Sequence, residues 1–147
     1  MWEFEHTVET AADRAFAWRF WTDVSNWAFD TSIEWVRLEG PFASGTKGAT
    51  KSPGLDPVHW VLRDVRAEEG AAVEMALPEA TLRFQWSFRE AAEVGTRITQ
   101  RVTLAGPGAA VFVEQAAKEF ERGIPEGMQK LAALITAACN EAKIEGA

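Results

Sequence analysis

Tyrosine is absent from this 147-residue sequence, and cysteine and histidine are scarce, with one and two residues. The lone Cys139 excludes an intramolecular disulfide and a thiolate metal cluster. His6 and His59 are too few for a three-histidine metal site, and no other metal-ligand spacing occurs. We therefore expect neither a metal nor another cofactor.

Long hydrophobic runs and a secretory signal are missing as well. No uncharged run reaches the length of about 18 residues that crosses a bilayer as a helix. The first residues, Met-Trp-Glu-Phe-Glu-His, lack the basic and apolar regions of a signal peptide. These absences predict a cytoplasmic protein that does not insert into a membrane.

Positive charge is in the minority. The chain has 15 Lys and Arg residues against 22 Asp and Glu, a net charge of −7, and both signs are mixed along its length. Nucleic acids and anionic membranes attract basic patches, so neither is an expected partner. The glycine-rich stretch 40–48 lacks the Gly-Lys-Ser/Thr of a phosphate loop, and no Gly-x-Ser-x-Gly nucleophile elbow is present.

What the sequence does contain is a large set of aromatic side chains without phenolic hydroxyls. Seven Trp and nine Phe residues are present. Such side chains either fill a hydrophobic core or line an apolar cavity. The function of the protein depends on which of these two roles they take.

Alternation of apolar and polar residues predicts seven strands. They span residues 2–9, 33–38, 46–51, 58–67, 71–77, 81–90 and 96–104. The first strand places His6 on its apolar face, opposite a face rich in glutamate. The clearest alternation puts Phe84, Trp86 and Phe88 together on one face of the sixth strand.

Helices are predicted on both sides of this run of strands. Two short ones follow the first strand, over about residues 12–20 and then from Asp23 or Ser25, which are both suitable N-cap residues. A much longer helix over residues 109–143 is indicated by apolar residues at three- and four-residue intervals. Gly123 and Pro125 interrupt it, and we expect a kink there because the apolar period resumes in phase.

Strands with one apolar and one polar face form an antiparallel sheet that is covered on a single side. The last helix is the only predicted element long enough to cover it. We therefore predict an α+β fold in which a curved antiparallel sheet of about seven strands, in the order β-α-α-β6-α, wraps around a long C-terminal helix. No repeat or linker divides the chain, so residues 1–147 are expected to form a single domain.

Several stretches carry a family likeness. They are residues 21–27 (Trp-Thr-Asp-Val-Ser-Asn-Trp), residues 39–42 running into 45–48, residues 95–99, Gly106-Pro107 and Gly123-Ile124-Pro125. In these stretches the chain resembles the START-like helix-grip superfamily, and within it the polyketide cyclase/dehydrase and lipid-transport (SRPBCC) group. The resemblance implies a helix-grip fold with a hydrophobic cavity between sheet and long helix. It does not choose an activity, because such folds serve carriers, receptors and aromatase/cyclases.

Two polar residues on predicted apolar faces are candidate catalytic groups. A neutral His6 imidazole can act as an acid or base on a bound carbonyl compound, or it can be a core histidine satisfied by backbone or water. Gln100 interrupts an apolar face, and a buried amide is costly unless a protein group, a water or a ligand pairs with it. Both interpretations stay open for each residue.

Candidate ligand-binding residues come from the apolar faces of the sheet and of the long helix. They are Trp60, Met75, Phe84, Trp86 and Phe88 on the strands and Phe120, Ile124 and Met128 on the helix. Each one is either cavity wall or ordinary core packing.

Three hypotheses follow. The first is a binding protein, either carrier or sensor, for a hydrophobic or aromatic small molecule of lipid-like or polyketide-like character. The second, implied by the resemblance, is a polyketide cyclase/dehydrase-like enzyme with His6 as acid or base and Gln100 orienting a carbonyl, so whether the protein is an enzyme stays open. The third is a protein-interaction module of the chaperone-activator type. The sequence is compatible with a monomer or a homodimer.

Overall fold

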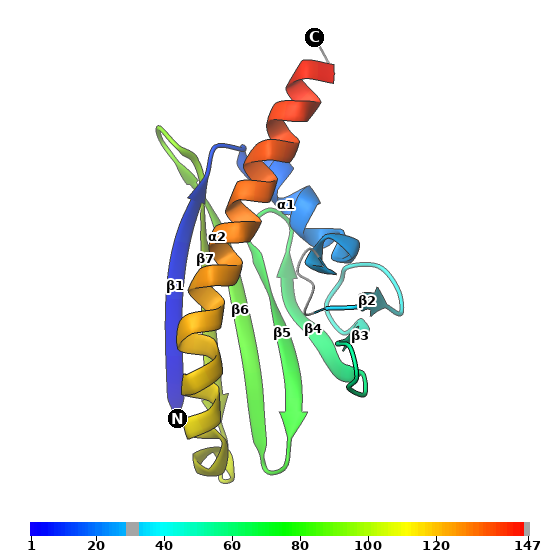
Figure 1. The fold of residues 1–147 in the computed structure, drawn as a ribbon, viewed down its shortest axis with the longest axis vertical. Coiled ribbons are helices and arrows are strands. Elements are labelled where there is room, and N and C mark those ends of the chain that lie inside the picture. Colours follow the sequence, from blue (N-terminus) through cyan, green and yellow to red (C-terminus); the bar gives the residue numbers. More distant parts are fainter. Residues whose placement is uncertain (29–32, 146–147) are drawn as a thin grey trace.

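A computed structural model describes residues 1–28 and 33–145 and shows seven strands around one long helix (Figure 1). The strands are β1 (Trp2–Thr10), β2 (Trp35–Leu38), β3 (Lys47–Lys51), β4 (Val58–Arg66), β5 (Gly70–Leu77), β6 (Ala80–Ala91) and β7 (Gly95–Ala105). The helices are α1 (Arg14–Thr22) and α2 (Val113–Glu145), with two 3-10 turns, η1 (Val24–Ala28) and η2 (Ala109–Phe112).

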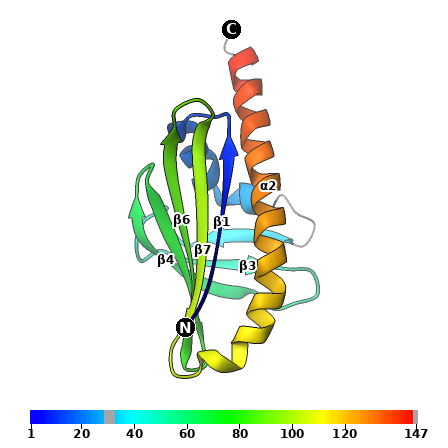
Figure 2. The ribbon, with the colours of Figure 1, turned by 90° about the vertical axis from the view of Figure 1, so that its left-hand side faces the viewer.

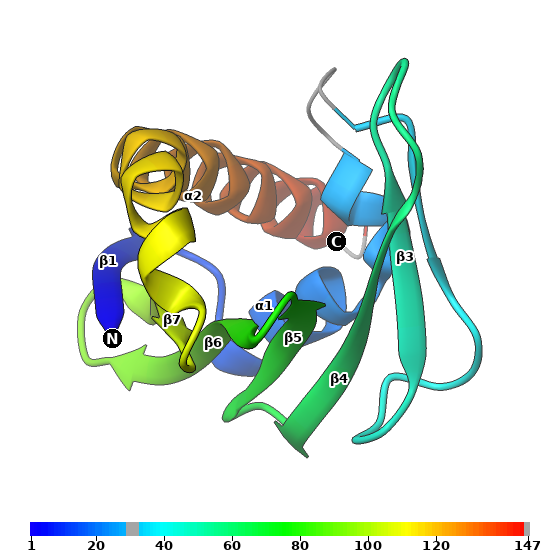
Figure 3. The same ribbon diagram turned by 90° about the horizontal axis from the view of Figure 1, so that it is seen from below.

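All strands pair antiparallel in one sheet, in the order β1-β7-β6-β5-β4-β3-β2. Strands β2 to β7 form a meander, and β1 pairs with β7, so that the first and last strands are neighbours. Seen from below, the sheet curls around α2 (Figure 3). The predicted curved sheet and helix-grip architecture are confirmed.

The long helix α2 covers the concave face of the sheet and runs alongside β1 (Figure 2). Its apolar stripe is buried against the strands, and its buried residues are Ala116, Ile124, Met128, Leu131, Ala132, Ile135 and Cys139. Pro125 lies inside the helix, which continues past it without ending. The long C-terminal helix predicted from about residue 109 is confirmed, and its first four residues, 109–112, form the 3-10 turn η2.

The short helices after β1 close one end of the space between sheet and α2. The Asp13 carboxylate caps α1 by accepting a hydrogen bond from the Phe16 backbone N–H at 2.7 Å. The second predicted helix is the 3-10 turn η1. Together they bring Trp18, Trp21 and Trp27 over the sheet.

An aromatic cluster joins this end to the sheet. Trp21 is 2% exposed, and its ring centroid lies 5.3 Å from Phe88 and 5.2 Å from both Phe42 and Trp86. Trp18 meets Phe88 edge-on at 5.5 Å. These tilted and edge-to-face contacts hold the α1 end of the molecule rigidly against β6.

No described helix is both long and apolar enough to cross a membrane.

Candidate functional site

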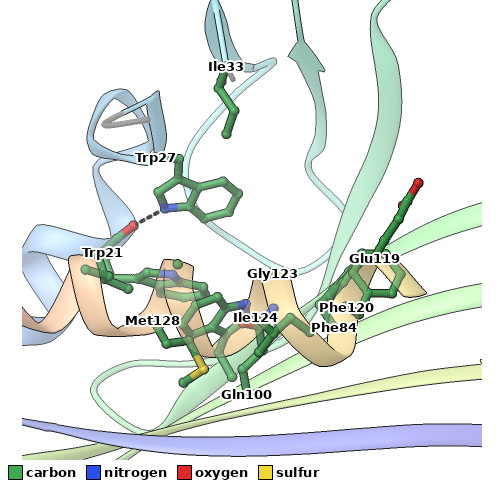
Figure 4. Close-up of a pocket in the computed structure, with 13 residues that line it drawn as sticks. Trp21, Trp27, Ile33, Phe84, Gln100, Glu119, Phe120, Gly123, Ile124 and Met128 are labelled. Carbon is green, nitrogen blue, oxygen red and sulfur yellow. Dashed lines mark hydrogen bonds between the residues drawn. The ribbon is translucent and has the colours of Figure 1, made fainter. Parts of the chain in front are cut away.

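A pocket of about 450 Å³ lies between α2, the sheet and the tryptophans of α1 and η1 (Figure 4). Thirteen residues line it: Trp21, Trp27, Ile33, Phe84, Trp86, Gln100, Glu119, Phe120, Gly123, Ile124, Gly127, Met128 and Leu131. Its volume is within the range of small-molecule sites, which is roughly 300–1,000 Å³.

The sheet supplies the floor through one row of paired residues. His6 of β1, Gln100 of β7 and Trp86 of β6 are Cα partners across adjacent strands and therefore share the inner face. Phe84 and Val102 form the next inward row. Of these residues, Phe84, Trp86 and Gln100 reach the pocket.

Gln100 is the one buried polar residue in the floor. The residue is 8% exposed, and no hydrogen bond to its amide is found among residues 1–28 and 33–145. A buried amide without a partner loses free energy relative to its hydrated state. The Gln100 amide is therefore a free donor and acceptor at the base of an apolar pocket (Figure 4).

The helix supplies a second wall from successive turns. Phe120, Ile124, Met128 and Leu131 recur at four- and three-residue intervals and so point to the same side of α2. Phe120 meets Phe84 edge-on at 5.3 Å, which closes the pocket between helix and sheet at that end. The apolar period predicted from the sequence thus forms this wall.

The tryptophans at the α1 end form a third wall. The Trp27 indole N–H donates a hydrogen bond to the Trp21 carbonyl at 2.6 Å (Figure 4), and their rings lie 5.4 Å apart. This bond fixes the Trp27 ring at the pocket edge and satisfies its only donor. The wall it presents is consequently apolar.

Charge is nearly absent from the lining. Glu119 is the only charged residue among the thirteen, and it is exposed at the rim. Lys, Arg and His do not occur in this set of lining residues. An anion entering the pocket would lose its hydration without gaining a cationic partner.

The structure brings six of the predicted site residues together. Phe84, Trp86, Gln100, Phe120, Ile124 and Met128 all line the pocket. His6 does not line it, although it is half-buried beside Gln100 on the inner face.

The other three predicted residues lie in the core outside the pocket. Phe88 is 1% exposed beneath Trp18 and Trp21. Trp60 is 4% exposed, packs over Gly48 and donates from its indole to the Thr50 hydroxyl at 3.0 Å. Met75 is half-buried and packs against the hydrophobic core. Phe88 and Trp60 are thus covered by aromatic side chains, with Trp27 packing against Trp60.

Seven lining residues were not predicted as site residues. They are Trp21, Trp27, Ile33, Glu119, Gly123, Gly127 and Leu131. The crowding of tryptophans near α1 could have indicated Trp21 and Trp27, since large aromatic side chains in short helices pack against a neighbouring apolar surface. Gly127 gives no such signal, because a single glycine in a helical pattern does not reveal what faces it.

A group of ion pairs lies on the outer face of the sheet. Glu74 pairs there with Arg83 and Arg63. Burial lowers the pKa of Arg83, but hydrogen bonds and charge from Asp64 and Glu74 outweigh this and raise its pKa above the ordinary value. In the described part of the chain, no three His, Cys, Asp or Glu side chains converge on a common metal site.

A curved antiparallel sheet gripping a long C-terminal helix, with an apolar pocket between them, defines a helix-grip protein. The family model for polyketide cyclase / dehydrase and lipid transport matches residues 1–136, and the chain belongs to this family. A comparison with curated protein sequences finds no match.

Solved structures share the fold at low sequence identity. Protein NE0264 from Nitrosomonas europaea has a TM-score of 0.71 at 17% identity, covering 92% of this chain and 95% of that one. Ara h 8.0201 has a TM-score of 0.69 at 17% identity, covering 92% and 98%. The di-domain ARO/CYC StfQ from the steffimycin biosynthetic pathway has a TM-score of 0.72 at 13% identity, covering 96% of this chain and 52% of StfQ.

Proposed function

We propose that this protein binds a hydrophobic or aromatic small molecule in the pocket between sheet and α2, as a carrier or a sensor. The observation that carries the proposal is a pocket of about 450 Å³ with apolar walls and one unpartnered amide, Gln100, at its base. Family membership supports it, since the family description includes lipid transport.

The free energy of binding would come chiefly from desolvation. Burial of apolar surface contributes on the order of 25 cal/mol per Å², and rigid aromatic walls lose little side-chain entropy when a ligand enters. A hydrogen bond to Gln100 would orient the ligand, as a few polar groups do in apolar sites.

The first test is native mass spectrometry on freshly purified protein, followed by denaturation and identification of released molecules. A stoichiometric hydrophobic adduct is expected, and its chemistry would define the ligand class. In parallel, titration with hydrophobic probes should change tryptophan fluorescence, because Trp21, Trp27 and Trp86 line the pocket. Absence of both an adduct and a fluorescence response would refute the proposal.

An enzymatic function is the second candidate, favoured by the pairing of His6 with Gln100. These residues are direct cross-strand partners on the inner face, so an imidazole lies next to the amide that faces the pocket. In this proposal His6 is the acid or base of a cyclase/dehydrase-like reaction and Gln100 orients a carbonyl. If His6→Ala left turnover of an identified substrate unchanged, His6 would have no such role.

A further inference from the structure

Gly123 and Gly127 occupy successive turns of α2 and line the pocket. Glycine in a helix interior is less favourable than alanine because it loses more backbone entropy on folding. Two such residues within one helix call for a structural reason.

The protein's own packing does not supply that reason. A Cβ built at Gly123 or Gly127 meets no heavy atom within 4 Å outside the local helix backbone, and neither residue has a positive φ. Gly48 differs, because a Cβ there would overlap the Trp60 ring, and Gly95 combines a φ of 105° with close backbone neighbours. Both helix glycines instead adjoin open space: Gly123 is exposed at the edge of the pocket, and Gly127 is half-buried in its lining.

A second, independent observation concerns the same space. Gln100 is more than nine-tenths buried as a residue, and its amide, which is open to this pocket, has no hydrogen-bond partner in the described part of the chain. The pocket therefore has helix backbone without side chains at Gly123 and Gly127 in its wall, and the unpaired Gln100 amide at its base.

The charge of the lining restricts the occupant further. Glu119, the only charged residue among the described residues of the lining, lies on the same helix one turn before Gly123. A carboxylate ligand would be desolvated without a cation and repelled by Glu119. An uncharged ligand avoids both the loss of hydration of a charge and the repulsion by Glu119.

We propose that Gly123 and Gly127 are specificity-determining residues, and that their bare backbone accepts the flat face of an uncharged ring compound whose carbonyl or hydroxyl binds Gln100. This inference rests on the proposed function and specifies its ligand. Alanine at either glycine places a methyl group where the ring would lie, and it also strengthens the helix. Stability and affinity should consequently change in opposite directions, which a purely structural role of the glycines does not predict.

The test uses three naphthalenes substituted at the same ring position: methyl naphthyl ketone, ethylnaphthalene and naphthoate. Each is titrated into the wild type and into the Gly123→Ala/Gly127→Ala double variant, with tryptophan fluorescence as the readout. We expect the wild type to bind the ketone at least about tenfold more tightly than naphthoate, and more tightly than ethylnaphthalene. The double variant should melt a few degrees higher, roughly 3–6 °C, and bind the ketone at least about fivefold more weakly.

Ala137→Gly is the matched control, since Ala137 is exposed on the same helix and does not line the pocket. It should lower the melting temperature and leave the affinity for the ketone unchanged. Equal affinity of wild type and double variant for the ketone would overturn the role of the glycines, and equal affinity of the wild type for ketone and naphthoate would overturn the selection of uncharged ligands. Either result leaves the proposed function standing, whereas a wild type that binds none of the three and releases no adduct overturns both.

Discussion

At the scale of single residues, Gln100 carries the most information about function. It is a buried residue whose amide lacks a hydrogen-bond partner in the described part of the chain, and it lies between His6 of β1 and Trp86 of β6. Native structures satisfy most buried polar groups. An exception at the base of a pocket is what the proposed ligand binding would explain.

Replacing this amide should separate stability from binding. We expect Gln100→Leu to stabilise the ligand-free protein by about 1 kcal/mol, because an unpaired buried amide is removed, and to weaken binding of a carbonyl ligand about tenfold. Urea denaturation and fluorescence titration measure the two effects. Gln85→Leu is the matched control, since Gln85 faces outward and accepts a hydrogen bond from Arg83 at 2.9 Å; that variant should not weaken binding. A Gln100→Leu protein less stable than wild type would contradict this account.

Gly48 is required for a packing contact away from the pocket. A Cβ at this position would overlap the six-membered ring of Trp60, which is itself buried and hydrogen-bonded to Thr50. We expect Gly48→Ala to lower the free energy of unfolding by about 2 kcal/mol, within the range for overpacked cores. Chemical denaturation measures the loss. The double variant Gly48→Ala/Trp60→Leu should lose less than the sum of the single changes, and simple additivity would exclude this contact as the cause.

At the scale of elements, an ion-pair network joins three strands on the outer face of the sheet. Arg83 of β6 pairs with Glu74 of β5 and with Asp64 of β4. Asp64 has a φ of 48° and lies where the β4–β5 register shifts between Arg63 and Arg66. Asp accepts this left-handed conformation more readily than most residues. The bulge thus turns a carboxylate toward the arginine of a strand that is not its neighbour.

Removing Arg83 should therefore loosen this part of the sheet without affecting the pocket. We expect Arg83→Met to cost about 1 kcal/mol, since the ion pairs are only partly shielded from water, and the loss should shrink in high salt. Thermal unfolding at two salt concentrations measures it. Arg89→Met, at an exposed position of the same strand, is the control and should have a smaller effect. A change in ligand affinity in the Arg83 variant would contradict the separation of the two faces.

Much of each element could be predicted from residue patterns. Alternation placed Phe84, Trp86 and Gln100 on the inner face, and helical periodicity placed Phe120, Ile124 and Met128 on the facing side of α2. The two-residue period of a strand and the 3.6-residue period of a helix show which face of the element a residue occupies. Apolar residues recur at these periods because one face of each element is buried.

Position along a face could not be predicted in the same way. Phe88 and Trp60 share the inner face with pocket residues, but they are covered by Trp18 and Trp21 in one case and by Trp27 in the other. That outcome depends on where the short helices and the curled sheet come together, which is a property of tertiary packing. For the same reason Gly127 could not be recognised as a pocket residue.

At the scale of the whole molecule, ligand and fold should stabilise each other. The pocket is bounded by the sheet, α2 and the tryptophans of α1 and η1, so a ligand contacts every layer of the native state and none of this site exists in the unfolded chain. Methyl naphthyl ketone at about 100 times its dissociation constant should add roughly 2.7 kcal/mol to the stability. Differential scanning calorimetry should show a higher melting temperature, with a smaller rise for Gln100→Leu. A melting temperature independent of ketone concentration would contradict binding at this site.

The pairing of the first strand with the last has a consequence for how the protein forms in the cell. The hydroxyls of Thr7 and Thr99 meet at 2.9 Å across 92 positions of sequence, and those of Thr10 and Thr136 meet at 2.7 Å across 126. Contacts this distant slow folding, because a long loop must close before they form. While the ribosome is still synthesising α2, β1 has no complete partner surface and the pocket lacks its helical wall. The complete pocket therefore forms only after α2 has been synthesised and has packed against the sheet.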